Sequence, residues 1–330
     1  MKRINKIPKN FVGGWSPSPR DDRDFIYSAY QPLGAIPEKY KDEVMVNQLL
    51  KYVHNQGQQP SCVAESGSKI QVYQEYKEGI EDDFSVRFLY SIAKKLDEWN
   101  GDGTYLRTMS KVMVNQGAPV EKVYLTDYSL SKDEFKDWTK IPQEVFDKAM
   151  IYADKSYAVI FPSYTDKEGS FQLIKQAIYL NGIAMAGFWG DNQGWQTAHI
   201  KLPKVNAWGH SVPLIYYDKD YIYFLNSWGK DWGNGGIGYF DKSYLPGEVW
   251  TFIDKLNKPN NVEFMKFVRT ISSSTVYILN DITMTAKPIL QGSDYVAITD
   301  DKDFKQVKVI EQNVLNKYQI VGTICSCLRK

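Results

Sequence analysis

Cysteine is scarce in this chain of 330 residues, which contains only Cys62, Cys325 and Cys327. Cys325 and Cys327 are so close in sequence that a bond between them would close only a local loop. The composition therefore excludes a secreted scaffold built on disulfides. Cys62 stands alone in the rest of the chain, so it is either a small buried core residue or a reactive group.

Net charge and long apolar stretches are also lacking. Forty basic and 39 acidic side chains leave a charge of +1, so no overall field attracts nucleic acid or an anionic membrane. No window approaches the roughly 18 consecutive apolar residues of a membrane-spanning helix, and the basic N-terminus does not continue as a Sec signal. With 43% hydrophobic residues, the sequence predicts a soluble globular protein, cytoplasmic or released without a Sec signal.

The pattern divides the chain into three parts. Residues 1–35 are rich in proline and charge, which predicts an irregular arm. Residues 36–255 are mainly helical at first and then mainly sheet, an α+β pattern, with Ser61 as an expected N-cap. We expect helices from 61, at 84–96, 105–115 and 170–180, and strands at 157–160, 183–186 and 211–217. A linker at 255–261 precedes a small all-β module, residues 258–330, with strands expected at 263–271, 275–279, 295–298, 304–310 and 318–324.

The surroundings of Cys62 favour chemistry over core packing. A thiol at the N-terminus of a helix faces the positive end of the helix dipole, which lowers its pKa and favours the thiolate. Gln56 precedes it by six residues and carries an amide that would stabilise an oxyanion. The sequence therefore predicts that Cys62 is a nucleophile.

A nucleophile of this kind needs a base, and the chain has only three histidines, His54, His199 and His210. His210 lies in one of two strand-like runs separated by the turn sequence Asp-Lys-Asp at 218–220, which predicts an antiparallel hairpin. With a turn centred on Asp218, His210 and Asn226 would lie directly opposite each other, about 5 Å apart at Cβ. Asn226 would then orient the imidazole.

Together these motifs resemble the papain-like cysteine peptidases, family C1. The motifs are Asn55-Gln56-Gly57, Ser61-Cys62, Gly209-His210 and Asn226-Ser227-Trp228-Gly229, followed by a glycine-rich run. The resemblance covers about residues 36–244, and the arm and residues 102–107 look most like bacterial and phage-type members. It implies a helical lobe and a sheet lobe with a substrate cleft between them.

The resemblance also implies a role for each matching residue. Cys62 is the nucleophile, His210 the general base and acid, Asn226 the orienting residue and Gln56 an oxyanion donor. Trp228 would shield the bond between His210 and Asn226 from water. The substrate cleft is expected to include Pro60, Ser61, Asp102, Gly103, Gly209 and Trp228.

The chain departs from the family pattern before Cys62, where it reads Gln59-Pro60-Ser61 without a cysteine. The usual disulfide is therefore lost, and the usual long inhibitory pro-region is also missing. The arm of residues 1–35 either occupies the cleft or lies over the surface as a strap, and we expect the strap.

Other motifs carry no function in this interpretation. The glycines at 233–238 have the spacing of a dinucleotide fingerprint but lack its strand and helix context. We expect no cofactor and no metal site, since Cys325 and Cys327 lack a second ligand pair and belong to a frayed tail. His199 is expected in a surface loop. His54, beside the oxyanion loop, would either tune the local charge or be a bystander, and we expect the bystander.

The sequence therefore predicts a thiol endopeptidase that acts on polypeptides. Two alternatives remain open. The same triad would serve acyl transfer or cleavage of a non-protein amide, such as a peptidoglycan cross-bridge. Alternatively, the cleft only grips a polypeptide and the β module supplies the main activity. For that module, binding of a protein partner and simple stabilisation of the peptidase domain are both open.

Overall fold

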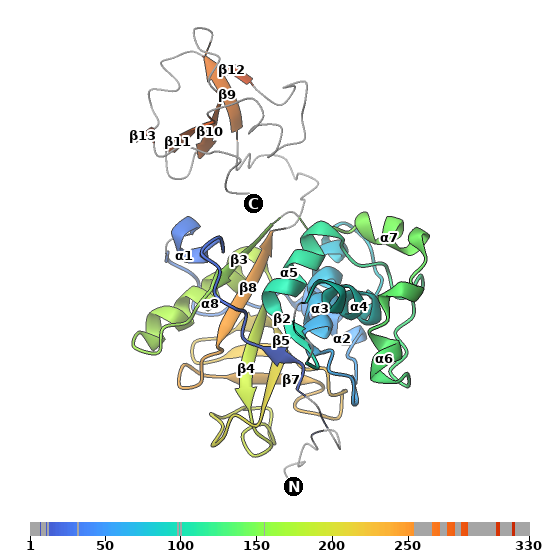
Figure 1. Cartoon of the computed structure of the whole chain (residues 1–330). Coiled ribbons are helices and arrows are strands. Elements are labelled where there is room, and N and C mark those ends of the chain that lie inside the picture. The colour runs from blue at the N-terminus through green and yellow to red at the C-terminus, as the bar shows by residue number, and fades with distance from the viewer. Residues whose placement is uncertain are drawn as a thin grey trace. The chain divides into compact units, whose positions relative to one another are not determined.

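The computed structural model describes Ile7, Phe11 and residues 13–31, 33–97, 99, 101–154 and 156–253, together with five strands of the C-terminal region. Contacts within the chain group it into two units, Met1–Lys255 and Leu256–Lys330 (Figure 1).

The first half of the larger unit is helical, as expected. Its elements are α1 (Tyr27–Tyr30), α2 (Glu43–Lys51), α3 (Cys62–Lys77), α4 (Val86–Leu96), α5 (Leu106–Asn115), α6 (Lys132–Phe135), a 3-10 turn (Trp138–Lys140) and α7 (Gln143–Met150). The helices expected at 61, 84–96 and 105–115 are confirmed as α3, α4 and α5, whereas α2 was not predicted. Ser61 is the N-cap residue of α3, as expected, although its side chain makes no capping hydrogen bond.

Helix α3 is the central element of this half and is buried along almost its whole length. Small residues allow its neighbours to approach. A Cβ atom added to Gly67 would lie 3.1 Å from the Met109 sulfur of α5, so α3 and α5 touch across this glycine. This close packing keeps the N-terminus of α3 rigid.

The second half forms a six-stranded antiparallel sheet in the order β3-β8-β4-β5-β6-β7. The strands are β3 (Ser156–Ile160), β4 (Ala184–Gly190), β5 (Trp208–Tyr217), β6 (Ile222–Leu225), β7 (Ile237–Phe240) and β8 (Glu248–Ile253). Helix α8 (Lys167–Asn181) follows β3 and packs against β5 and β8. The expected α+β fold class is confirmed.

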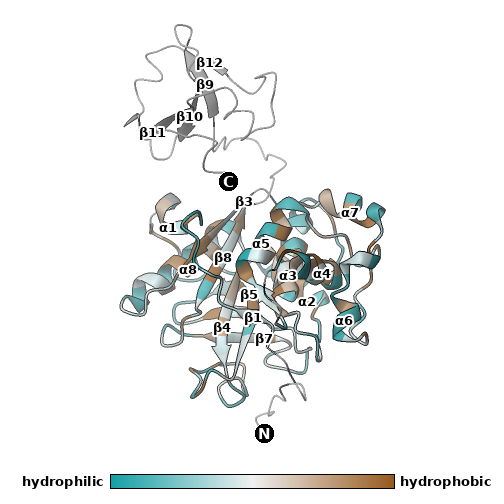
Figure 2. Ribbon diagram, in the orientation of Figure 1, coloured by the Kyte–Doolittle hydropathy of each residue, from teal (hydrophilic) through white to brown (hydrophobic). Residues whose placement is uncertain are grey.

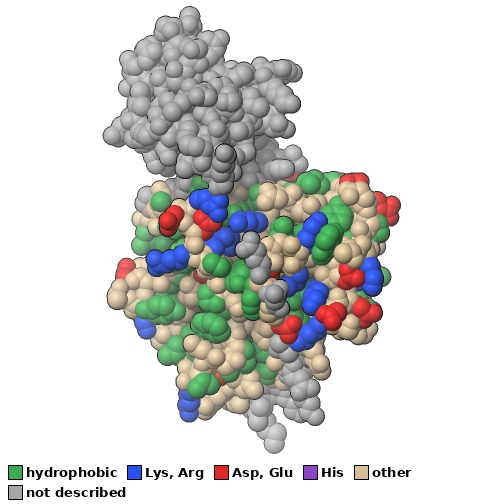
Figure 3. Space-filling view, in the orientation of Figure 1, with side chains coloured by type: hydrophobic (Ala, Val, Ile, Leu, Met, Phe, Trp, Pro, Cys, Tyr) green, Lys and Arg blue, Asp and Glu red, His purple; other side chains and the backbone are tan. Residues whose placement is uncertain are grey.

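Hydrophobic side chains form two buried clusters, one around α3, α4 and α5 and one between α8 and the sheet. In Figure 2 hydrophobic residues gather along the strands, whereas the outer helix α6 is largely hydrophilic. Acidic and basic side chains are intermixed on the face shown in Figure 3, which agrees with the net charge near zero.

A short strand of the N-terminal arm lies between the two halves. Strand β1 (Trp15–Ser16) pairs in parallel with β2 (Thr104–Tyr105), the segment that leads into α5. In Figure 1 the blue N-terminal segment runs between the helices and the sheet.

The smaller unit contains β9 (Lys266–Thr270), β10 (Val276–Asn280), β11 (Thr285–Ile289), β12 (Lys308–Ile310) and β13 (Gln319–Ile320), in the sheet order β12-β9-β10-β11-β13. Four of the five expected strands overlap β9, β10, β12 and β13. Strand β11 was not predicted, and it contains Pro288. The expected strand at 295–298 and the pair Cys325 and Cys327 lie outside the described residues.

Candidate active site

Cys62 is the first residue of α3 and is a free thiol with no exposed surface. Burial raises the pKa of this thiol to about 12, although the backbone N–H groups of Ser211 and Gly14 act in the opposite direction. Ser211 follows His210 on β5, and its hydroxyl lies 2.8 Å from that of Ser66 on α3. The nucleophile helix and the histidine strand are therefore in direct contact.

His210 and Asn226 are hydrogen-bonded, as the sequence predicts. The Nε2 atom of His210 lies 2.8 Å from Oδ1 of Asn226, which also accepts from the backbone N–H of Ser227. His210 is fully buried, and this burial lowers its pKa to about 4. Its other ring nitrogen, Nδ1, has no hydrogen-bond partner in the part of the chain that the structure describes.

The hairpin that carries these two residues has a different register from the expected one. Tyr217 pairs with Ile222, and a bulge follows before Leu214 pairs with Phe224. The turn therefore centres between Lys219 and Asp220, and His210 does not lie directly opposite Asn226. The hydrogen bond forms diagonally, because both side chains reach along the strands.

Gln56 lies in the loop before α3 and is completely buried. Its backbone N–H donates to the Ser227 carbonyl at 2.9 Å, and its Oε1 accepts from the Ser227 hydroxyl at 2.6 Å. The amide nitrogen donates one hydrogen to the Gln59 carbonyl at 2.7 Å. A primary amide carries two hydrogens, so a second donor remains for another acceptor.

Trp228 covers the imidazole of His210. The two rings stack with centroids 4.8 Å apart at an angle of 28°. The Trp195 ring meets His210 edge-on at 5.4 Å, and the Phe11 ring of the arm does so at 5.2 Å. Aromatic rings thus exclude water from His210 on several sides.

Comparisons with solved structures identify the fold. Xylellain, a cysteine protease from Xylella fastidiosa, matches with a TM-score of 0.61 and 21% identity, over 76% of this chain and 98% of its own. The chain has the papain-like fold. Procathepsin B from Trypanosoma congolense matches with a TM-score of 0.54 and 14% identity, over 75% of this chain and 87% of its own. Digestive procathepsin L 3 of Tenebrio molitor matches with a TM-score of 0.55 and 14% identity, over 74% of this chain and 76% of its own.

Comparison of the whole sequence with known families and curated proteins finds no match. No protein-family model matches the chain, and no curated protein does so. The papain-like fold is thus seen through the structure and through a few short motifs.

The N-terminal arm occupies the papain-like cleft, so the expectation of a surface strap was wrong. The Gly14 N–H donates to the Gly209 carbonyl at 3.0 Å on the sheet side. The Thr104 N–H donates to the Gly14 carbonyl at 3.0 Å on the helical side. One residue of the arm is therefore bonded to both walls of the cleft.

Glycines make this close approach possible. A Cβ atom on Gly14 would lie 3.0 Å from the Cys62 sulfur and would overlap the Pro60 carbonyl. Gly103 has φ of +89°, and a Cβ atom there would overlap the backbone of Gly14. The arm thus lies directly over Cys62, with the expected cleft residues Pro60, Gly103 and Gly209 against it.

Trp15 anchors the arm in the sheet lobe. Its indole N–H donates to Oε1 of Glu248 at 3.0 Å, and the same oxygen accepts from the backbone N–H of Ser18 at 3.0 Å. Only 3% of Trp15 is exposed, and a Cβ atom on Gly187 would overlap its ring. The sequence analysis did not find this anchor, because nothing near Trp15 in sequence marks Glu248 as its partner.

The remaining expected cleft residues are Ser61, which is buried, and Asp102, which is half-exposed. Ser61 is buried beside Cys62, and its hydroxyl has no hydrogen-bond partner within the described residues. Asp102 is half-exposed and forms an ion pair with Lys132 at 2.5 Å, so its carboxylate is engaged at the surface.

Lys94 is a residue of the cleft wall that the sequence analysis missed. Its ammonium group donates to the backbone carbonyls of Trp99, Gly101 and Gly103, each at 3.0 Å. It therefore ties together the loop that ends at the cleft edge. No local sequence pattern marks a lysine for this role.

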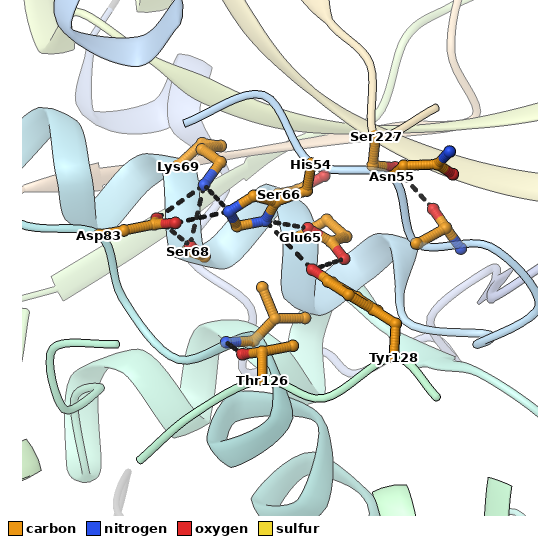
Figure 4. Close-up of polar contacts among 12 residues, drawn as sticks. His54, Asn55, Glu65, Ser66, Ser68, Lys69, Asp83, Thr126, Tyr128 and Ser227 are labelled. Carbon is orange, nitrogen blue, oxygen red and sulfur yellow. Dashed lines mark hydrogen bonds and ion pairs between the residues drawn. The ribbon is translucent and has the colours of Figure 1, made fainter. Parts of the chain in front are cut away.

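The two remaining histidines have different surroundings. His199 is partly exposed and lies 3.0 Å from Asp241, in agreement with the expected surface loop. His54, expected to be a bystander, lies in a partly buried cluster of charged side chains (Figure 4). Among the described residues, no group of three or more side chains has the arrangement of a metal site.

Proposed function

We propose that this protein is a thiol endopeptidase whose cleft is covered by its own N-terminal arm. The observation that carries the proposal is the bond between His210 and Asn226 beside the free thiol of Cys62. A cysteine, a base and a group that orients the base are the elements of nucleophilic catalysis. The papain-like fold supports the proposal.

In the proposed reaction His210 removes the proton of Cys62, and the thiolate attacks a peptide carbonyl carbon. Gln56 and the backbone N–H of Cys62 stabilise the oxyanion. His210 then donates the proton to the leaving amine, and a thioester forms. Water, deprotonated by His210, hydrolyses this thioester and restores the thiol.

The covered cleft corresponds to a closed state, and any activity of the full chain comes from molecules in which the arm has left the cleft. Burial raises the pKa of Cys62 to about 12 and lowers that of His210 to about 4, so both groups are neutral at pH 7. Departure of the arm would expose both groups to water. The desolvation that disfavours the thiolate and imidazolium pair would then decrease.

The cleft also indicates the class of substrate. The arm binds as an extended segment, paired through its backbone with Gly209 and Thr104. Backbone pairing of this kind accepts any polypeptide strand with small enough side chains at the point of contact. We therefore propose a polypeptide substrate.

The test is Cys62→Ala, made both in the full chain and in a chain that begins at residue 20. Hydrolysis of casein or of a fluorogenic peptide should fall to background in both, because Cys62 is the one free cysteine among the described residues and the proposed site of the acyl-enzyme. Proteolysis retained by Cys62→Ala would contradict the proposal.

One observation favours a second function, in which the cleft binds a polypeptide without cleaving it. The cleft already holds a peptide segment, and the thiol beneath it is protonated. Selective labelling of Cys62 by iodoacetamide once the arm is removed would speak against this alternative. Acyl transfer would be recognised by mass spectrometry of products formed with a competing amine.

The described part of the chain contains no helix with the length and hydrophobicity needed to cross a membrane. We propose that the smaller unit, Leu256–Lys330, binds a protein partner and so selects the substrate.

A further inference from the structure

Five ionisable side chains are buried together behind the oxyanion loop, the segment His54-Asn55-Gln56 (Figure 4). They come from four different parts of the chain. The loop contributes His54 and α3 contributes Glu65 and Lys69, which lie one and two turns beyond Cys62. Asp83 precedes α4, and Tyr128 follows α5.

His54 is the centre of this cluster. Its Nδ1 lies 2.7 Å from Oε2 of Glu65, and its Nε2 lies 2.5 Å from Oδ2 of Asp83. Lys69 donates to Oδ1 of Asp83 at 2.8 Å, and the Tyr128 hydroxyl donates to Oε1 of Glu65 at 2.8 Å. Both ring nitrogens of His54 therefore face carboxylates.

The cluster is mostly removed from water, with side-chain exposures of 15% for His54, 3% for Glu65, 4% for Lys69 and 12% for Asp83. Burial and Lys69 lower the pKa of His54, but the two carboxylates outweigh them and raise it to about 9. An imidazolium and an ammonium thus balance two carboxylates. Loss of one member would leave a buried charge without a partner.

The cluster acts on the oxyanion loop from behind, while the sheet lobe holds the same loop in front. The His54 carbonyl accepts from the Gly229 N–H at 2.8 Å, and Asn55 forms a β-bridge with Trp228. The Gln56 N–H donates to the Ser227 carbonyl at 2.9 Å. The side chain of His54 is therefore the link between this loop and the helix that carries Cys62.

Little free space separates the cluster from the triad. A cavity of about 10 Å³ lies between them, lined by His54, Glu65 and Lys69 on one side and by Ser211, Asn226 and Ser227 on the other. This volume is about that of a single water position, so it cannot absorb a displaced side chain. A shift of His54 would move the loop or its neighbours.

We propose that His54, held between Glu65 and Asp83, is a positioning residue that sets the place of Gln56 relative to Cys62. The inference rests on the proposed thiol peptidase function. His54 touches no reacting atom. It acts through Gln56, because the two residues belong to one short loop that is clamped on both sides.

The two reactions of Cys62 distinguish this role from a general structural one. Hydrolysis passes through an oxyanion, so a displaced oxyanion donor lowers kcat more than it changes KM. Alkylation by iodoacetamide displaces iodide at a saturated carbon and forms no oxyanion. A positioning defect at Gln56 should therefore slow hydrolysis and spare alkylation.

The experiment compares His54→Gln with His199→Gln, a matched control at the other histidine that is paired with a carboxylate. All variants are made in the full chain. For His54→Gln we expect kcat for a fluorogenic peptide to fall about 100-fold, the size of effect seen for one oxyanion donor. KM and the rate of Cys62 alkylation should stay within about twofold of wild type, and His199→Gln should resemble wild type.

Tyr128→Phe is a second test variant, to be used if His54→Gln does not fold. It removes one buried hydroxyl from the same cluster and should lower kcat about tenfold, again without slowing alkylation. Equal losses in hydrolysis and alkylation would overturn the inference, as would an unchanged kcat in both cluster variants. A wild-type protein that is alkylated at Cys62 but hydrolyses no peptide would overturn the proposed function, and the inference with it.

Discussion

Burial controls the charge of each residue that the proposed chemistry needs. Cys62 and His210 are both fully buried, and the same desolvation raises the pKa of the thiol and lowers that of the imidazole. His54 is also largely buried, yet its pKa is raised, because Glu65 and Asp83 contact both nitrogens. Two histidines of one protein thus differ in charge at neutral pH through their partners.

The raised pKa of His54 leads to a stability prediction. The ordinary value is 6.5 and the folded value is about 9, so the contribution to folding is complete below pH 6.5 and is lost as the pH rises through 9. We expect the Tm of the wild-type protein to fall between pH 7 and pH 10. The free-energy contribution is on the order of 3 kcal/mol, at 1.36 kcal/mol per pKa unit.

The measurement is thermal unfolding followed across this pH range. His54→Gln should have a lower Tm than wild type at pH 7, and its Tm should change little between pH 7 and pH 10. The Tm of His199→Gln should fall over this range as that of the wild type does. The other ionisable groups that face His54 are Glu65, Lys69, Asp83 and Tyr128. A decline of equal size in His54→Gln would assign it to another group.

At the scale of elements, the arm and the walls of the cleft hold each other in place. Strand β1 is paired with β2, Trp15 is bonded to Glu248, and Arg107 on α5 donates to Asp24 at 2.8 Å through its Nε. Arg107 also donates to the Pro19 carbonyl. These contacts follow the arm from β1 to the start of α1, so release of the arm requires several of them to break.

Trp15 is the side chain whose loss should free the arm. Trp15→Ala removes the bond to Glu248 and a fully buried ring, a change that typically costs about 3 to 5 kcal/mol. We expect kcat/KM for a small peptide to rise at least tenfold, and Cys62 to react faster with iodoacetamide, because the arm leaves the cleft more often.

Trp138→Ala is the matched control, since Trp138 is 38% exposed and lies in the short 3-10 turn away from the arm. It should leave both rates unchanged. If Trp15→Ala also leaves them unchanged, the arm does not limit access to Cys62.

Lys94 should affect substrate binding through the loop at the cleft edge. Lys94→Met removes the donor for the carbonyls of Trp99, Gly101 and Gly103, the last of which precedes the residue that pairs with the arm. We expect KM to rise about 3- to 10-fold, which corresponds to about 1 kcal/mol, with a smaller change in kcat.

The control for Lys94→Met is Lys95→Met on the same helix. The Lys95 ammonium lies over the Trp138 ring at 4.0 Å, and within the described residues it makes no bond to the loop. Steady-state kinetics should show KM close to wild type for Lys95→Met. If the two variants have similar KM values, Lys94 does not stabilise the cleft wall.

At the scale of the whole molecule, both hydrophobic clusters are formed by residues of the larger unit. A chain that ends at Asp254 keeps all of β8 and both clusters. We therefore expect its Tm and its kcat/KM for a small soluble peptide to stay within about 3 °C and twofold of the full chain. Calorimetry and a peptidase assay on both chains provide the measurement.

The activity of the shortened chain on a large protein substrate is to be compared with its activity on the small peptide. A loss seen there alone would assign the smaller unit to partner choice. A lower Tm or poor solubility of the shortened chain would instead show that this unit stabilises the peptidase domain.

The sequence by itself determined which residues are candidates for the proposed triad, and their order. Cys62 is recognisable because it begins a helix, and His210 and Asn226 because they flank one hairpin, so each signal depends on neighbours in sequence. Even the error in the hairpin register left the bond between them intact. The α+β fold class followed from the change of hydrophobic period along the chain.

Only the tertiary structure decided where the arm lies and what His54 does. Gly14 meets Gly209 and Thr104, and His54 meets Glu65 and Asp83, through contacts between segments far apart in sequence. Such pairings depend on how well distant surfaces fit and on the cost of burying charge, and neither leaves a local pattern. The sequence therefore names the chemical groups, and the packing of the chain decides that they are covered, neutral and held in place.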